Sequence, residues 1–256
     1  MNTNQIEALK RTIYQAGAII KYQWNKPRQI THKGKIDLVT DTDLAVEKFL
    51  IDQISQTFPQ ATFIAEETNP DLILGKETFI IDPLDGTTNF AHKIPFVAIS
   101  VAYAQAQEIV WGAIYAPILD EFFWAQKGLG SFLNQTPISV SNNSQLEKSL
   151  IATGFPYSIQ ENATYLTQKL KNVLTKTQGV RRAGAAAIDL AYTACGRFEG
   201  FYEIELKPWD TAAGWLLVEE AGGMVTDFKG NPYQLGQKEI LASNGSVHQE
   251  LLSLLA

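Results

Sequence analysis

Five segments in the first half of the chain have the features of β-strands. Each is rich in Val, Ile or aromatic residues, and turn-forming residues separate one segment from the next. They are residues 61–65, 78–82, 96–104, 108–115 and 121–125. Because short hairpin connections join them, the sequence predicts a largely antiparallel sheet in this half.

Helices are expected beside these strands. Apolar residues recur at helical spacing over residues 4–24, which predicts an amphipathic helix with one face on the core. A second helix is expected to begin near Thr40, because Thr40 and Asp43 have the spacing of a capping box. The pattern that follows places Leu44 and Glu47 on a common helical face with apolar residues.

The second half of the chain alternates between helices and strands. The expected elements are helices near residues 162–176, 185–195 and 208–221, and a strand at residues 200–203. Since no repeat, low-complexity tract or long linker interrupts the chain, we expect residues 1–256 to form a single domain. Its sub-halves are residues 1–143 and 144–256, and the fold class is mixed α/β.

Composition argues against several classes of function. A net charge of −6 and the lack of a dense Lys/Arg run argue against direct nucleic-acid binding. The sequence shows neither a leader pattern nor a membrane-length apolar stretch, so a cytoplasmic protein without a membrane partner is expected. The single cysteine, Cys195, is expected to be core filler, and the three histidines lack metal-ligand spacing. Any chemistry should therefore use carboxylates and hydroxyls.

The segment Asp82–Asn89 joins two carboxylates to a predicted turn. Asp82 and Asp85 follow an apolar strand, and the amides of Gly86 and Thr87 are expected to open toward the space between these acids. A helix start binds anions through its unpaired N–H groups. Carboxylates beside a bound anion need a hard cation between them, such as Mg²⁺. The motif therefore indicates a metal with a phosphate, whereas Asp-Gly alone is typical of an ordinary turn.

Three further groups of acids lie at the ends of predicted elements. Glu66-Glu67 follows a predicted strand, Asp43 lies in the first turn of the second helix, and Asp210 begins a later helix. Taken singly, Asp43 and Asp210 are typical helix caps that contribute about 1 kcal/mol each, and Glu66-Glu67 is typical of solvated surface. Together with Asp82–Asn89, these acids indicate a common site.

In this order the motifs resemble those of the inositol monophosphatase family, among the lithium-sensitive, magnesium-dependent sugar and nucleotide phosphatases. The matching motifs are Asp37–Asp43, Glu66-Glu67, Asp82–Phe90, Pro208–Asp210 and Glu219–Gly223. The resemblance implies a layered αβαβα sandwich of the inositol monophosphatase and fructose-1,6-bisphosphatase type, assembled as a homodimer. It implies Mg²⁺-dependent hydrolysis of a small-molecule phosphate monoester, expected to be myo-inositol 1-phosphate, with inhibition by Li⁺.

The same resemblance implies ligands for two Mg²⁺ ions and leaves a weaker third ion near Glu66 open. The first ion is expected to be held by Glu66, Asp82, the carbonyl of Leu84 and the hydroxyl of Thr87. The second is expected to be held by Asp82, Asp85 and Asp210. The implied reaction is in-line attack by a metal-activated water.

The catalytic residues that the resemblance implies are Asp43, Glu66 and Thr87. Asp43 and Thr87 are expected to orient and deprotonate the water, which Glu66 helps to hold. The amides of Gly86 and Thr87 are expected to bind the phosphate.

For the organic part of the substrate, the resemblance points to one carboxylate beside the metals, one later carboxylate and a backbone segment. These are Asp85, Glu203 and residues Gly184, Ala185 and Ala186. Many relatives have Ser or Thr where this chain has Ala185, so the resemblance does not extend to strict inositol specificity. The pair Arg181-Arg182 could reach a second phosphate or a nucleotide, or form ion pairs at a subunit interface.

Two alternatives therefore stay open. Within the same chemistry, the substrate could be a bisphosphate, such as fructose 1,6-bisphosphate or adenosine 3′,5′-bisphosphate. In a different class, some bacterial relatives act with the transcription machinery, so the chain could be a binding partner with incidental phosphatase activity.

Overall fold

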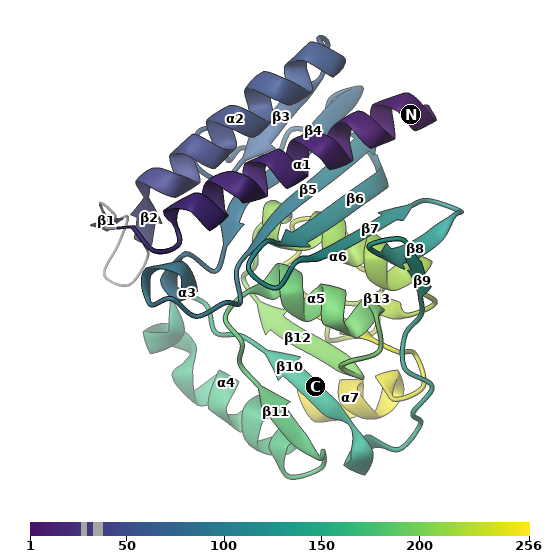
Figure 1. Ribbon diagram of the computed structural model, residues 1–256. Coiled ribbons are helices and arrows are strands. Elements are labelled where there is room, and N and C mark those ends of the chain that lie inside the picture. The colour runs from purple at the N-terminus through teal and green to yellow at the C-terminus, as the bar shows by residue number, and fades with distance from the viewer. Residues whose placement is uncertain (27–29, 33–37) are drawn as a thin grey trace.

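The computed structural model describes residues 1–26, 30–32 and 38–256. Helices and sheets alternate in layers (Figure 1). The helices on the outer face of the first sheet are α1 (Thr3–Gln23) and α2 (Asp41–Thr57). The helices between the two sheets are α5 (Ala186–Ala194) and α6 (Pro208–Glu220). The helices on the outer face of the second sheet are α4 (Ile159–Leu174) and α7 (His248–Leu255). This is the αβαβα sandwich that the resemblance implied.

In the described residues the first sheet has seven strands in the order β3-β4-β5-β6-β7-β8-β9. Their bounds are β3 (Thr62–Ala65), β4 (Glu77–Asp85), β5 (Ala98–Gln105), β6 (Glu108–Ala116), β7 (Glu121–Gln126), β8 (Gly130–Leu133) and β9 (Thr136–Ile138). β3 and β4 are parallel, and every other neighbouring pair is antiparallel. The expected antiparallel-rich first half is confirmed.

The second sheet has five strands in the described residues, in the order β11-β10-β12-β14-β13. Their bounds are β10 (Leu150–Thr153), β11 (Gly179–Arg181), β12 (Gly200–Ile204), β13 (Met224–Thr226) and β14 (Glu239–Ser243). β10 is parallel to both of its neighbours, whereas β14 is antiparallel to β12 and β13. A separate antiparallel pair, β1 (Ile30–His32) and β2 (Leu38–Thr40), leads into α2.

Among the residues that the structure describes, three hydrophobic clusters hold the layers together. One packs α1 and α2 on the first sheet, one fills the space between the sheets around α5 and α6, and one packs α4 and α7 on the second sheet. The central cluster joins side chains from both halves of the chain, such as Ile80 and Phe201. Burial of this apolar surface on both faces of each sheet is the main stabilising contribution to the fold.

Two sequence expectations need correction. The strand predicted to end at Asp82 continues to Asp85, because the pairing with β5 resumes after an irregularity. Leu44 was expected on the same helical face as Glu47, but it is 49% exposed, whereas Glu47 is buried together with Asp43 and Val46. Because α2 buries acids as well as apolar residues, its buried face is not a purely apolar stripe.

Candidate active site

A bulge in β4 turns two acids toward the same side of the sheet. Residues three apart on a regular strand face opposite ways. In β4, however, Asp82 pairs with Ser100 and Asp85 pairs with Ala98, so three steps along β4 match two steps along β5. Pro83 lies within this irregularity and has no N–H to donate to a neighbouring strand. The bulge thus allows Asp82 and Asp85 to belong to one cluster.

Gly86 follows the bulge and begins the short helix α3 (Thr87–Ala91). Its φ of 87° is in the left-handed region, and a Cβ at this position would lie 2.7 Å from the Phe96 carbonyl oxygen. Only glycine fits both conditions. The Gly86 amide is also close enough to Asp85 to lower the pKa of that carboxyl.

α2 brings Asp43 to the same place from a different layer. Asp43 is 1% exposed, and its Oδ1 accepts a hydrogen bond from Thr87 Oγ1 at 2.9 Å. Its Oδ2 accepts from the Thr40 amide at 2.9 Å, which confirms the expected capping box. Burial raises the pKa of Asp43 above its ordinary value, and the bonds from Thr40 and Thr87 partly offset this rise. Asp43 is therefore both a helix cap and the acceptor of a hydrogen bond from the Thr87 hydroxyl.

Asp85 caps the start of α5. Its Oδ2 accepts a hydrogen bond from the Ala187 amide at 2.7 Å. Ala185, at the N-cap position of α5, has no side-chain oxygen to fill this role, and both Ala185 and Ala186 are buried. The carboxylate from β4 thus ties the segment around Gly184 to the acidic cluster.

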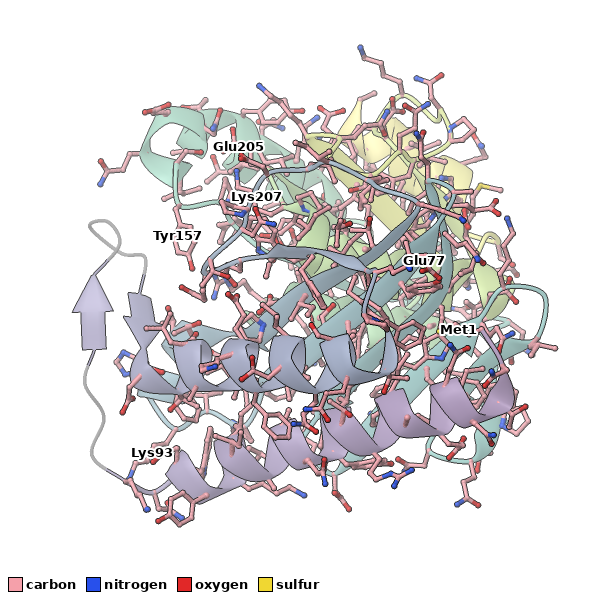
Figure 2. All side chains as sticks on the ribbon, turned by 90° about the horizontal axis from the view of Figure 1, so that it is seen from above. Met1, Glu77, Lys93, Tyr157, Glu205 and Lys207 are labelled. Atoms are coloured by element: carbon pink, nitrogen blue, oxygen red, sulfur yellow. The ribbon has the colours of Figure 1, made fainter. Side chains whose placement is uncertain are left out.

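Asp210 and Glu203 come from the second half of the chain. Asp210 lies in the first turn of α6, where its Oδ2 accepts from the Lys207 amide at 2.7 Å, and Glu203 is on β12 with 8% of its surface exposed. Both carboxylates interact with Asp85 strongly enough to alter pKa values. In Figure 2, Glu205 and Lys207 mark this side of the molecule, and Glu77, where β4 begins, lies well away from them. The site thus lies toward the C-terminal end of β4.

Glu66 lies in the turn that follows β3 and is half-buried, as is Glu67. Its amide donates to the Ile81 carbonyl at 3.3 Å, which sets the turn beside β4. The Glu66 charge raises the pKa of both Asp82 and Asp85. The structure therefore places Glu66 with the cluster and not on open surface. Asp37, the first residue of the resembling motifs, lies outside the described residues.

Mutual repulsion and burial dominate the electrostatics of these acids. Burial is the largest cause of the shift for each; it raises the pKa of Asp82 well above its ordinary value, and Glu66, Asp85 and Asp210 raise it further. The pKa is raised to about 7 for Asp85 and Asp210 and to about 8 for Glu203. A site that disfavours its own negative charges in this way is suited to hold a cation.

The donors fit a hard metal ion. They are carboxylates, the Leu84 carbonyl and the Thr87 hydroxyl, all of them oxygen ligands, and Thr87 Oγ1 lies 3.1 Å from the Leu84 oxygen. Among the described residues, no three Asp, Glu, His or Cys side chains converge closely enough to enclose an ion by themselves. Mg²⁺ commonly uses one or two carboxylates and completes its shell with water and phosphate oxygens, which this arrangement permits.

The pKa shifts predict how pH affects the chelated protein. Asp85, Asp210 and Glu203 have native pKa values of about 7 to 8, whereas unfolded carboxyls titrate near about 4. Between about pH 6.5 and about pH 8 the native state therefore binds more protons than the unfolded chain, and stability must fall as pH rises. The pKa of His248 is lowered to about 4 in the native state, whereas an unfolded histidine titrates near about 6.5, so below about pH 6.5 this residue has the opposite effect on stability. The window above about pH 6.5 therefore isolates the effect of the carboxyls.

Thermal melts in EDTA test this expectation. The midpoint should fall across that pH window, and added Mg²⁺ should recover most of the loss at the upper end. A midpoint that rises steadily with pH in EDTA would contradict the electrostatic account of the cluster.

Three polar residues near the site carried no expected role. Asn89 Nδ2 donates to the carbonyls of Phe96, Ala183 and Gly184, at 2.8, 2.9 and 3.2 Å, and so joins α3 to the segment before α5. Glu47 bonds to the turn that carries Glu66. Asp189 on α5 is buried, with no hydrogen-bond partner for Oδ1 among the described residues. In the sequence, Glu47 has helical spacing from Asp43 and Asn89 lies within the motif Asp82–Asn89, but neither pattern predicts these bonds, and Asp189 gave no signal.

The chain also resembles known proteins over its whole length. A family model described as the inositol monophosphatase family matches residues 1–256. Inositol monophosphatase 2 of Solanum lycopersicum is 41% identical over 98% of this chain and 96% of its own length. Nus factor SuhB of Salmonella typhimurium is 38% identical over 95% of this chain and 92% of its own length. The crystal structure of extragenic suppressor protein suhB from Bartonella henselae superposes with a TM-score of 0.93, at 39% identity, covering 98% and 97% of the two chains.

The layered fold and its cluster of oxygen donors define a metal-dependent phosphatase that hydrolyses phosphate monoesters. The chain belongs to the inositol monophosphatase family. Within the described residues, no helix is both long and apolar enough to cross a membrane.

Proposed function

We propose that the substrate is myo-inositol 1-phosphate and that the metal is Mg²⁺. The observation that carries this proposal is the set of mutually repelling acids, Asp82, Asp85, Asp210 and Glu66, beside the hydrogen-bonded pair of Asp43 and Thr87. The first set suits a cation and the second suits proton transfer. Hydrolysis of a phosphate monoester needs both, because a cation offsets the negative charge of the phosphate and a base takes a proton from the attacking water.

Mg²⁺, when bound, supplies the positive charge that offsets the phosphate and makes water a better nucleophile. The residues that would hold one ion are Glu66, Asp82, the carbonyl of Leu84 and the hydroxyl of Thr87. Those that would hold a second are Asp82, Asp85 and Asp210, which would have to move closer together than they lie in the described structure. Asp82 would therefore serve both ions, and its near-complete burial, at 1% exposure, limits its other partners to groups within the site.

Thr87 and Asp43 would act on the attacking water. With its hydroxyl donating to Asp43 Oδ1, Thr87 keeps an oxygen lone pair that can accept a hydrogen bond from water. A proton that passes from this water to Thr87 would release the Thr87 hydroxyl proton to Asp43. Burial raises the pKa of Asp43, which makes this carboxylate a stronger base. The bonds from Thr40 hold Asp43 in the orientation that this transfer requires.

The rest of the substrate would meet Glu203, Asp85 and the start of α5. Carboxylates accept hydrogen bonds from neighbouring hydroxyls, which suits a polyol. Gly154 allows the Glu203 carboxylate to lie directly over its backbone, since a Cβ there would be 2.1 Å from Glu203 Oε2. The amides of Gly86 and Thr87 remain the candidates for binding phosphate, with the Gly86 amide shared with Asp85.

A panel of phosphate esters tests the substrate. We expect phosphate release to be faster from myo-inositol 1-phosphate than from fructose 1,6-bisphosphate or adenosine 3′,5′-bisphosphate. The exposed Arg182, whose positive charge lowers the pKa of Glu203, keeps a bisphosphate as the second candidate. A rate on fructose 1,6-bisphosphate far above the rate on inositol 1-phosphate would overturn the proposed substrate.

The relative named Nus factor SuhB favours a second candidate function, as a partner of the transcription machinery. A strain carrying only Asp85→Asn separates the two functions, because this change removes a proposed metal ligand and leaves the outer surface unaltered. Loss of the cellular role would assign that role to catalysis, whereas full retention would assign it to binding.

We also propose that the protein is a homodimer of single-domain subunits, that it is cytoplasmic, and that Li⁺ inhibits it. These proposals follow from the family and from the sequence. Activity that is unchanged in high millimolar Li⁺ would count against the last of them.

A further inference from the structure

The turn that carries Glu66 is closed by its own backbone. Ala65 and Asn69 exchange two backbone hydrogen bonds, at 2.9 and 3.0 Å, and the Asn69 side chain donates to the Phe63 carbonyl. These contacts shape the turn, but all of them lie within it and the strand before it. They do not by themselves fix the turn against the layer of helices.

Glu47 on α2 supplies that attachment. Its Oε2 accepts from the Glu67 amide at 2.8 Å, and its Oε1 accepts from Thr68 Oγ1 at 2.6 Å. Glu47 is 1% exposed, although a buried carboxylate is costly unless its oxygens are hydrogen-bonded. Both of its oxygens are therefore used to hold the residues that directly follow Glu66.

The hydrogen bonds that Glu47 accepts hold the Glu66 turn close to acids that repel Glu66. Glu66 interacts unfavourably with the charges of Asp82 and Asp85. A turn free to relax would move Glu66 away from those acids until a cation was bound. Glu47 lies one helical turn after Asp43, so the buried face of α2 holds Thr87 through Asp43 and the Glu66 turn through Glu47.

We propose that Glu47 is a positioning residue that sets Glu66 for metal binding. The proposal rests on the proposed function, because it assumes that Glu66 is a ligand of Mg²⁺. Outer residues that orient metal ligands typically change metal affinity by about 10–100-fold when they are substituted. A residue that only stabilised α2 would change the melting temperature and leave the affinity of the folded protein for Mg²⁺ unchanged.

Four variants separate positioning from stability and from charge. Glu47→Ala removes both bonds. Glu47→Gln can keep both, with its amide oxygen accepting from the Glu67 amide and its amide nitrogen donating to Thr68 Oγ1, so it loses only the charge. Thr68→Ala removes one bond from an exposed residue and does not threaten folding. Asp52→Ala removes a carboxylate from the same helix at an exposed position that pairs with Lys48, and is the matched control.

The test is titration of each chelated and dialysed protein with Mg²⁺ by calorimetry, with circular dichroism to check folding. We expect the affinity for Mg²⁺ to fall by about 10-fold or more in Glu47→Ala. In Thr68→Ala it should fall by roughly 2–10-fold, the equivalent of one net hydrogen bond. Glu47→Gln and Asp52→Ala should bind Mg²⁺ nearly as the parent protein does.

Unchanged affinity in folded Glu47→Ala would overturn the proposal, as would a Glu47→Gln protein as weak as Glu47→Ala. If Glu47→Ala does not fold, Thr68→Ala carries the test, and parent-like affinity in that variant overturns the proposal. If the parent protein itself neither binds nor needs Mg²⁺, it is the proposed function that fails, and the role of Glu47 fails with it. The parent titration thus distinguishes the two failures.

Discussion

Asp82→Asn should abolish turnover. Asp82 is 1% exposed, and the charges of Glu66, Asp85 and Asp210 all act on it. If Asp82 is a ligand of both proposed ions, its replacement by a neutral amide weakens the binding of both. The loss should therefore exceed the about 10–100-fold effect typical of substituting an outer residue at a metal site.

The measurement is phosphate release at saturating Mg²⁺, with Asp71→Asn as the control because it neutralises an exposed acid outside the cluster. The chelated Asp82→Asn protein should also melt at a higher temperature than the chelated parent near pH 8, because one repelling charge is gone. Retention of a tenth or more of the parent activity would rule out the bridging role.

Thr87→Ala should separate catalysis from phosphate binding. The change removes the hydroxyl that bonds to Asp43 at 2.9 Å, but it leaves the backbone amides of Gly86 and residue 87 in place. General-base assistance is typically worth about 10²–10⁴-fold in rate, so the turnover number should fall by a factor in that range. Because the Thr87 hydroxyl is also a proposed ligand of one Mg²⁺ ion, the affinity for inorganic phosphate is measured by calorimetry at saturating Mg²⁺, where it should change much less.

Thr88→Ala is the matched control, because it removes the neighbouring hydroxyl from the same short helix at an exposed position. It should keep near-parent turnover. If Thr87→Ala lost phosphate affinity in proportion to its rate, Thr87 would act mainly through binding, and the proposed proton transfer to Asp43 would be wrong.

Much of the fold was predictable because local patterns agree with the layers. The buried residues of α1 recur at helical spacing, and β5, β6 and β7 each correspond to a predicted strand within a few residues. β10 was not predicted. It is a short, buried parallel strand in the second sheet, and a short apolar run of this kind has no distinctive period. Its assignment as a strand depends on pairing with β11 and β12, which are distant in sequence.

The site was predictable as a list of residues but not as an arrangement. Asp43, Asp82 and Asp210 stood out because each is an acid at the end of an element. The bulge that turns Asp82 and Asp85 to the same side depends on pairing with β5, and the capping of α5 by Asp85 joins segments about a hundred positions apart. Such contacts arise from tertiary packing, which a local pattern does not encode.

The residues that hold the site residues in place were the least predictable from the sequence. In the sequence Glu47 fits an ordinary amphipathic helix, and its burial and its two hydrogen bonds to the turn after β3 distinguish it from a surface acid only in the folded protein. Asn89 likewise stands inside a recognised motif, yet its three carbonyl partners come from two other segments. In both cases, the partners in the folded chain indicate the role, which the residue type alone does not.

The most direct test of the account is the release of inorganic phosphate from myo-inositol 1-phosphate by protein stripped with EDTA, before and after Mg²⁺ is restored. If the protein uses Mg²⁺ as proposed, it should release no phosphate above background in EDTA and should regain full activity once Mg²⁺ is added in excess. Hydrolysis that continues undiminished in EDTA, or that Mg²⁺ fails to restore in a protein shown to be folded, would contradict it.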